Sequence, residues 1–163
     1  PLETYGATKL TQERAFTREN TRCDTRILRL SSVYGPRMQL HGAEATILGQ
    51  IVGQVKKGIG PSFFEDGKQS RDWVWVEDVV GITRTLLSGW GGNVVNVCSG
   101  KATSLLDAAR LAAAKLHVDV EPTAIGGYRA GDMRHCLGGA SGLTALLGRE
   151  PTTLDDGLHE WLA

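Results

Sequence analysis

The amino-acid sequence predicts an α/β fold. Segments with helical periodicity alternate with short β-type segments along almost the whole chain, which is typical of α/β proteins. The length of 163 residues is enough for one ordinary domain. Hydrophobic residues make up 41% of the chain and charged residues 22%, so disordered and fibrous proteins are excluded.

The first half of the chain contains two predicted helices and three predicted strands. The helices cover residues 5–19 and 43–57, and the strands cover 25–33, 62–65 and 71–76. In the second helix, apolar residues from Ile47 to Val55 recur at helical spacing, and Gly58 suits a left-handed cap. Alternation along the third strand places Trp73 and Trp75 on one face, where paired aromatic side chains are more often core than ligand-binding.

The second half continues the alternation. A helix is predicted over 77–87, a strand over 93–98, a helix from Ser104 to Leu116, and two short helices over 143–147 and 153–162. Glu77 and Asp78 favour the positive end of a helix, and Ser104 with Asp107 resembles a capping box.

The overall charge and the cysteines exclude several kinds of partner. The 18 basic and 18 acidic residues give zero net charge, so no global field attracts nucleic acid or an anionic membrane. Cys23, Cys98 and Cys136 are scattered without metal-ligand spacing, so we predict no metal site and expect free thiols. No apolar run reaches the roughly 20 residues that span a bilayer, and we expect a cytoplasmic protein.

Tyr5 and Lys9 lie four residues apart at the start of the first predicted helix, so both side chains project from one face. A phenol is a poor base at neutral pH because its reference pKa is about 10. An ammonium within about 4 Å stabilises the phenolate, and such a tyrosine can exchange a proton with an alcohol. By itself, the pair is also common as a surface contact.

Five segments carry motifs in a fixed order: YGATK…E at 5–13, RLSSVYGP at 29–36, EDGKQSRDWVWVEDV at 65–79, RAGD at 129–132 and LGREP…LDDGL at 147–158. Together they cover nearly the whole chain. On these segments the sequence resembles the extended short-chain dehydrogenase/reductase family, and within it the NAD-dependent sugar-nucleotide epimerases and dehydratases.

The resemblance implies the C-terminal part of a Rossmann-like doubly wound sheet plus a small α/β substrate-binding lobe, with the N-terminal dinucleotide-binding half absent. The Rossmann-like portion is expected at approximately 1–35 and 73–118, and the lobe at approximately 36–72 and 119–163. No Gly-x-Gly-x-x-Gly fingerprint follows a predicted strand, and Pro1 stands only four residues before Tyr5. We therefore expect one incomplete domain.

The resemblance also implies roles for single residues. Tyr5 would be the catalytic acid/base, and Lys9 would bond the nicotinamide ribose while favouring the phenolate of Tyr5. Ser32 and Val33 would border the nicotinamide, and Ser32 would also contact substrate, although many relatives carry asparagine at that position.

Two arginines, Arg71 and Arg129, would bind the diphosphate of a nucleotide sugar, since a guanidinium matches phosphate oxygens in geometry and charge. For Arg71 the alternative is an ion pair at the strand edge with Asp72 or Glu65. Arg129 could instead be a solvated loop residue beside Asp132.

The implied function is that of an NAD-dependent nucleotide-sugar epimerase that resembles UDP-glucose 4-epimerase; NADP is not excluded. The alternatives are a nucleotide-sugar 4,6-dehydratase, a reductase, or a non-catalytic binding module. The resemblance further implies a homodimer through the helix Tyr5–Glu19. We expect the 163-residue chain alone to bind NAD weakly or not at all and to have no turnover.

Overall fold

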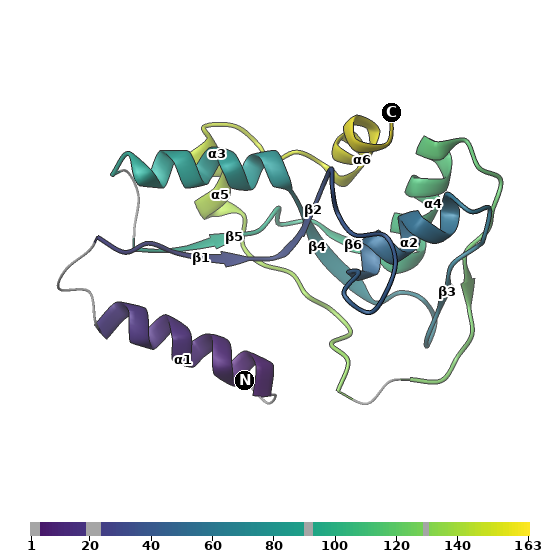
Figure 1. The fold of residues 1–163 in the computed structure, drawn as a ribbon, viewed down its shortest axis with the longest axis horizontal. Helices are drawn as coiled ribbons and strands as arrows, with labels where there is room; N and C mark the ends of the chain where they lie inside the picture. The colour runs from purple at the N-terminus through teal and green to yellow at the C-terminus, as the bar shows by residue number, and fades with distance from the viewer. Residues whose placement is uncertain (1–3, 19–23, 90–92, 129–130) are drawn as a thin grey trace.

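The computed structural model describes residues 4–18, 24–89, 93–128 and 131–163. Their elements follow in the order α1 (Thr4–Arg18), β1 (Ile27–Leu30), β2 (Ser32–Tyr34), α2 (Ile47–Val55), β3 (Ser62–Phe63), β4 (Ser70–Trp75), α3 (Val76–Leu87), β5 (Val94–Val97), β6 (Ala102–Ser104), α4 (Leu105–Leu116), β7 (Thr123–Ala124), α5 (Ser141–Leu147) and α6 (Leu154–Leu162) (Figure 1). The alternation of helices and strands confirms the predicted α/β class.

The strand predicted over 25–33 is divided at Ser31 into β1 and β2. The backbone N–H of Ser31 donates to the carbonyl of Val97, and its hydroxyl donates to the carbonyl of Asp72. The chain therefore leaves the partner of β1 and joins the partner of β2 at this residue. A continuous β-type sequence cannot reveal such a change of partner.

The strands of the described residues form three small sheets. β1 pairs in parallel with β5, β4 lies between a parallel β2 and an antiparallel β6, and β3 pairs in parallel with β7. The sequence did not predict β6 and β7, because strands of three and two residues are too short to show a period. The parallel strands β1 and β5 end on the same side, next to the start of β2.

β4 separates two hydrophobic cores. Trp73 and Trp75 belong to one core together with Tyr34 and residues of α2, α4 and α6. Val74 belongs to the other core, which contains residues of α3, β5 and α5. The predicted alternation along this strand is confirmed, and the two tryptophans are core residues, 3% and 2% exposed.

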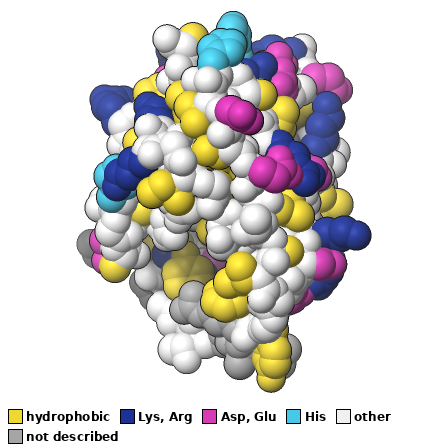
Figure 2. All heavy atoms as spheres, turned by 90° about the vertical axis from the view of Figure 1, so that its right-hand side faces the viewer, with side chains coloured by type: hydrophobic (Ala, Val, Ile, Leu, Met, Phe, Trp, Pro, Cys, Tyr) yellow, Lys and Arg dark blue, Asp and Glu magenta, His cyan; other side chains and the backbone are white. Residues whose placement is uncertain are grey.

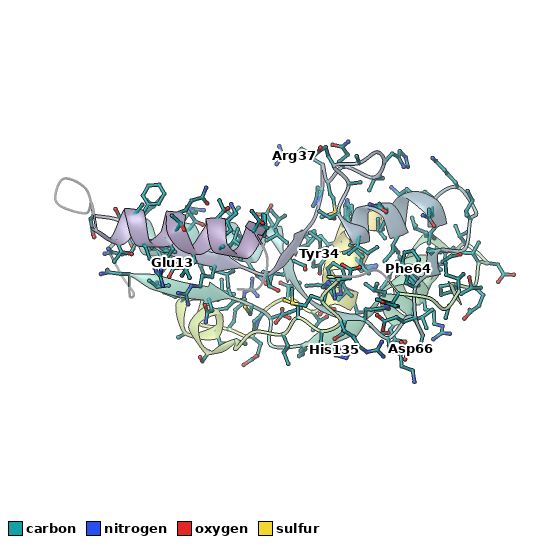
Figure 3. The ribbon with its side chains drawn as sticks, turned by 90° about the horizontal axis from the view of Figure 1, so that it is seen from below. Glu13, Tyr34, Arg37, Phe64, Asp66 and His135 are labelled. Atoms are coloured by element: carbon teal, nitrogen blue, oxygen red, sulfur yellow. The ribbon has the colours of Figure 1, made fainter. Side chains whose placement is uncertain are left out.

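The packing of the helices bears on the division of the chain into a Rossmann-like portion and a substrate-binding lobe, which stays a prediction. α4 packs against α2 and α6, whereas α5 packs against α3 and β5. We therefore propose that α4 belongs with the lobe and α5 with the Rossmann-like portion, the reverse of the ranges expected from the sequence. In Figure 3, Glu13 lies on α1 at the left, Phe64 and Asp66 lie at the right, and Tyr34 and His135 lie between them.

The helix ends follow the predicted signals in most places. Ser104 caps α4 by accepting from the backbone N–H of Asp107, which confirms the capping box as the start of that helix. α2 begins only at Ile47, because the Thr46 hydroxyl caps it by accepting from the N–H of Gly49. Gly58 follows with a φ of +71°, the left-handed conformation predicted for it.

The start of α3 is tied to the segment before α6 by a fully buried carboxylate. Asp78 accepts from the Thr152 backbone N–H at 2.7 Å, from the Thr152 hydroxyl at 3.2 Å and from the Arg149 guanidinium. A buried carboxylate requires such donors, since burial without them is costly. Asp78, near the end of the EDGKQSRDWVWVEDV segment, therefore binds Arg149 of the LGREP segment and Thr152, which follows it.

Tyr34 and Gly157 form a close contact between β2 and α6. The Tyr34 hydroxyl donates to the carbonyl of Thr153 at 3.2 Å, and a Cβ at position 157 would lie 2.1 Å from that hydroxyl oxygen. Burial, chiefly, raises the pKa of Tyr34 well above its ordinary value. Glycine is thus the side chain that lets α6 approach the aromatic ring.

The surface shows no concentration of one charge at the end of the molecule that carries α2, α4 and β3, where positive and negative side chains are interspersed (Figure 2). None of the helices in the described part of the chain has the length and apolar character that crossing a bilayer requires.

Candidate active site

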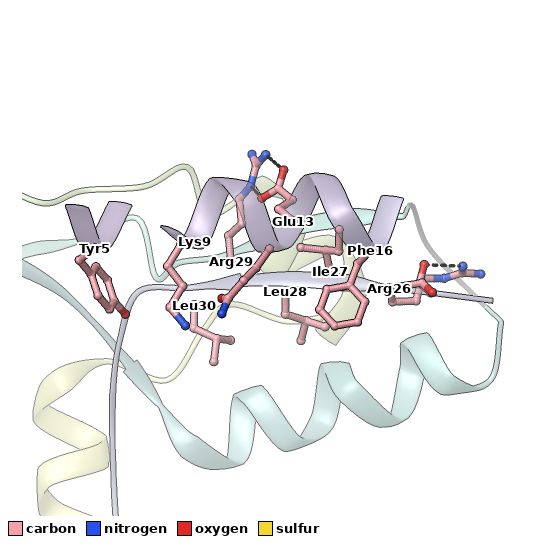
Figure 4. Close-up of a pocket in the computed structure, with 11 residues that line it drawn as sticks. Tyr5, Lys9, Glu13, Phe16, Arg26, Ile27, Leu28, Arg29 and Leu30 are labelled. Atoms are coloured by element: carbon pink, nitrogen blue, oxygen red, sulfur yellow. Dashed lines mark hydrogen bonds and ion pairs between the residues drawn. The ribbon is translucent and has the colours of Figure 1, made fainter. Parts of the chain in front are cut away.

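Tyr5 and Lys9 lie on one side of α1 (Figure 4). The Lys9 ammonium nitrogen is 5.6 Å from the centroid of the Tyr5 ring, within the range of a cation–π contact. Both side chains are exposed, Tyr5 by 74%. The described residues place no carboxylate within ion-pair distance of Lys9, which leaves its three N–H donors available to a ligand.

A groove of about 610 Å³ separates α1 from β1, and Tyr5 and Lys9 lie along its helix side (Figure 4). Most of its lining is apolar and includes Phe16, Leu28 and Leu30. The Tyr5–Lys9 pair lies at one end of the groove.

A bidentate ion pair joins the two sides of this groove. The Arg29 Nε donates to Oε2 of Glu13 at 2.8 Å, and Arg29 Nη2 donates to the other carboxylate oxygen. The hydrogen bond to Arg29 lowers the pKa of Glu13 below its ordinary value, and the same bond raises the pKa of Arg29. The glutamate of the YGATK…E segment and the arginine of the RLSSVYGP segment thus hold α1 to β1.

Ser32 and Val33 lie on β2, where they pair with Trp73 and Val74 of β4. Both are partly buried. They directly follow the carboxyl end of β1, and ligands of parallel α/β sheets bind beyond the carboxyl ends of the strands. Their position is therefore suitable for contact with a cofactor or substrate.

Arg71 lies on β4, two residues before Trp73. Its Nη1 donates to the carbonyl of Ser70 at 2.9 Å and to the carbonyl of Arg134 at 3.2 Å. The alternative interpretation from the sequence, an ion pair with Asp72 or Glu65, is wrong. The buried Asp72 carboxylate accepts hydrogen bonds from Ser99 and Gly100, and Glu65 pairs with Arg134 instead. Within the described ranges, Nε and Nη2 of Arg71 have no partner.

Arg129, the second predicted diphosphate ligand, lies outside the described residues. The segment that follows it, residues 134–138, runs along β4 and is named the return segment below. The Ser70 N–H donates to the carbonyl of Arg134 at 2.9 Å, and the Cys136 N–H donates to the carbonyl of Ser70 at 3.1 Å. The Arg134 guanidinium binds Glu65 and, at 2.8 Å, Asp66.

Sequence reasoning missed the role of Asp72, which is fully buried beside Arg71. One carboxylate oxygen accepts from the N–H and the hydroxyl of Ser99, each at 2.7 Å. The other accepts from the N–H of Gly100 at 3.0 Å and of Gly138 at 3.3 Å. The available signal was an acid inside a predicted strand, directly before Trp73, Val74 and Trp75, because a buried carboxylate must have several donors.

The structure brings Tyr5 and Lys9 together, and it places Ser32 and Val33 on the strand beside the one that carries Arg71. In the part of the chain that is described, no hydrogen bond or ion pair links the Tyr5–Lys9 pair to Ser32, Val33 or Arg71. The same part contains no group of three or more His, Cys, Asp or Glu side chains arranged to hold a metal ion.

Comparison with known proteins gives one family. Residues 1–98 match the NAD dependent epimerase/dehydratase family. The chain is 35% identical over 171 residues to the dTDP-L-rhamnose 4-epimerase of Burkholderia thailandensis, and the match covers 100% of this chain and 47% of that protein.

Solved structures agree with this match. The UDP-glucose 4-epimerase of Thermotoga maritima, solved with UDP-glucose, has a TM-score of 0.85 and 28% identity, with 99% of this chain and 53% of that chain covered. The UDP-glucuronic acid 4-epimerase of Bacillus cereus, solved with UDP-glucuronic acid and NAD, has a TM-score of 0.78 and 26% identity, with 99% and 52% covered.

The chain spans about half the length of the relatives that it matches. Its five motif segments, its α/β fold and these matches all point to the same group of proteins. The chain belongs to the NAD-dependent epimerase/dehydratase family.

Proposed function

We propose that this chain is part of an NAD-dependent nucleotide-sugar 4-epimerase. The observation that carries the proposal is the position of the Lys9 ammonium 5.6 Å from the ring centroid of Tyr5, on a chain of this family. The relatives named above are 4-epimerases of dTDP- or UDP-linked sugars. A diphosphate-linked sugar is therefore the proposed substrate class.

Tyr5 moves the proton in the proposed reaction. Its phenolate oxygen accepts the proton of the sugar C4 hydroxyl as the C4 hydrogen leaves as a hydride, which gives a 4-keto sugar. The same phenol returns the proton when the hydride comes back to the other face of C4, which yields the epimer. In the proposed reaction Lys9 supplies a positive charge on the same side of α1 as the phenol.

The residues present fit the nicotinamide end of NAD. When bound, this cofactor supplies the acceptor and donor of the hydride. Lys9 has no carboxylate partner among the described residues, so its N–H donors are available to the ribose hydroxyls. Ser32 and Val33 follow the carboxyl end of a parallel strand. NADP fits the same residues, since its additional phosphate is on the adenosine ribose.

Arg71 and Arg129 are proposed to hold the diphosphate. Two nitrogens of the Arg71 guanidinium are free within the described residues, and guanidinium–phosphate bonds are charge-assisted. Ser32 offers the sugar one hydroxyl where many relatives have an amide. This shorter side chain is expected to change which sugar is bound and not the chemistry.

The function is tested with Tyr5→Phe in the full-length protein. Removal of the proton carrier is expected to lower kcat by about 10²–10⁴-fold while the affinity for UDP-glucose stays the same. Tyr34→Phe is the matched control, because Tyr34 is a buried structural residue and its loss should leave kcat unchanged. Full turnover by Tyr5→Phe would refute the proposed role.

The same experiment separates the alternatives. A dehydratase or reductase would also lose turnover, but it would give a 4-keto-6-deoxy sugar or a reduced product in place of an epimer. A non-catalytic binding module would keep its biological function in the Tyr5→Phe variant.

The isolated 163-residue chain is proposed to be inactive and to bind NAD weakly or not at all. The outer edge of β1 has no strand partner in the described sheets, and Leu30 and Phe16 beside it are 51% and 63% exposed. Stoichiometric bound nicotinamide in the pure chain would contradict this. A homodimer through the helix 5–19 and a cytoplasmic location are part of the same proposal.

A further inference from the structure

Asp72 connects three parts of the chain at the site. Its carboxylate accepts from the Ser99–Gly100 turn that follows β5 and from Gly138 of the return segment. Its backbone carbonyl accepts from the hydroxyl of Ser31, between β1 and β2. The ends of β1 and β5 and the return segment are thus held at one residue of β4.

The backbone packs closely around this carboxylate. A Cβ at position 138 would lie 2.1 Å from the Cys98 sulfur, and a Cβ at position 100 would lie 2.8 Å from the Cβ of Ala140. Gly100 also has a φ of +74°. These glycines allow both N–H groups to reach one carboxylate oxygen, so the return segment has little room to shift while the bonds are intact.

The return segment in turn determines where the Arg71 guanidinium lies. Nη1 of Arg71 donates to the carbonyls of Ser70 and Arg134. Both carbonyls also belong to the backbone pairing between β4 and the return segment, since Arg134 accepts from the Ser70 N–H and Ser70 accepts from the Cys136 N–H. Displacement of the return segment would therefore remove the support of the guanidinium.

We propose that Asp72 is a positioning residue, which fixes the Arg71 guanidinium by holding the return segment against β4. The importance of this position for nucleotide-sugar binding rests on the proposed function. Of Arg71 and Asp72, only Arg71 contacts the substrate in this arrangement. Asp72 lies on the opposite face of the strand and acts through Gly138 and Arg134.

The test compares Asp72→Asn with Asp78→Asn in the full-length protein. An amide at position 72 presents N–H donors to either the Ser99 pair or the Gly100 and Gly138 pair, so one pair loses its acceptor. Asp78→Asn is the matched control, because this equally buried carboxylate has a similar set of donors but ties α3 to residues 149–152. Both variants are expected to lower Tm.

Two measurements are made on each variant. Calorimetry with UDP-glucose is expected to show affinity weakened roughly tenfold or more by Asp72→Asn and changed by less than about twofold by Asp78→Asn. The ¹⁵N–¹H signal of the Arg71 Nε group, assigned by its loss in Arg71→Lys, is expected to shift or broaden only in Asp72→Asn. Ser70→Ala, which removes the 2.9 Å hydrogen bond between Ser70 Oγ and His135 Nδ1, should move the signal in the same direction and serves if Asp72→Asn does not fold.

An unchanged Arg71 signal in both Asp72→Asn and Ser70→Ala would overturn the positioning role, as would equal effects of Asp72→Asn and Asp78→Asn. Binding measurements on the wild-type protein test the proposed substrate class separately. If it binds no UDP-glucose, UDP or dTDP, the proposed substrate class fails, and the Arg71 signal still decides the role of Asp72.

Discussion

The carboxylate of Glu13 on α1 and the guanidinium of Arg29 on β1 form a bidentate ion pair across the groove beside Tyr5 and Lys9. The pair is therefore placed to determine how α1, which carries the proposed catalytic residues, lies against the sheet. Because the pair is exposed to solvent, its effect is expected on the position of α1 more than on global stability.

Glu13→Gln is expected to increase amide hydrogen exchange in α1 at neutral pH. Arg29 lowers the pKa of Glu13 in the folded chain, so the ion pair contributes above the ordinary value of 4.5 and is lost as the pH falls through the lower folded value. The difference between wild type and Glu13→Gln should therefore disappear below that value. A difference that persists in acid, or is absent at pH 7, would show that the pair does not hold α1.

Gly157→Ala is expected to destabilise the protein by about 1–3 kcal/mol in urea unfolding, because the new methyl group would overlap the Tyr34 hydroxyl. Gly139→Ala is the control, since a Cβ there meets nothing within 4 Å and it should change the unfolding free energy by about 0.5 kcal/mol or less. Addition of Tyr34→Phe to Gly157→Ala should restore part of the loss. If the double variant is simply additive, the contact is not the cause.

Tyr34 is expected to make stability depend on alkaline pH. Burial raises its folded pKa above the unfolded value of about 10, so the unfolded chain releases the proton first and stability falls as the pH rises above that value. Urea unfolding at pH 8 and pH 11 should show a smaller loss for Tyr34→Phe than for wild type. Tyr128→Phe, which alters an exposed phenol, should behave as wild type does.

Arg71→Lys is expected to weaken UDP-glucose binding roughly tenfold, and Arg71→Met by more, because lysine keeps the charge but loses the planar fork. Arg84→Met, which removes an exposed arginine from the last turn of α3, is the control and should change the affinity by less than about twofold. Equal affinities for wild type and Arg71→Met would exclude Arg71 as a diphosphate ligand.

Helices and strands whose periodic pattern extends over many residues could be predicted from the sequence. The periodic apolar residues of α2 and α3 and the alternation along β4 gave the correct element types, because each helix buries one apolar face and β4 directs alternate residues into two cores. β6 and β7 could not be predicted, since their two or three residues pair only where the fold brings a partner strand beside them. The division of the predicted strand 25–33 at Ser31 could not be predicted for the same reason, because it depends on which partner strand lies beside each part.

In the candidate site, too, local contacts could be predicted from the sequence and contacts between distant residues could not. The pairing of Tyr5 with Lys9 follows from a spacing of four residues on one helix, and helical geometry alone brings such residues together. The contact of Arg71 with the Arg134 carbonyl joins residues that are 63 positions apart in the chain, so no local pattern contains it. The same is true of Asp72, whose donors lie 27 to 66 positions away.

The sequence by itself therefore determined the α/β class, the Tyr5–Lys9 pair and the family, because these depend on local periodicity and on motifs that keep their order. Only the tertiary structure decided that the Asp72 and Asp78 carboxylates are buried and join distant segments, and that Arg134 pairs with Glu65, one of the two carboxylates expected beside Arg71. The physical reason is that a carboxylate's role depends on which donors surround it, and the fold assembles those donors from distant segments.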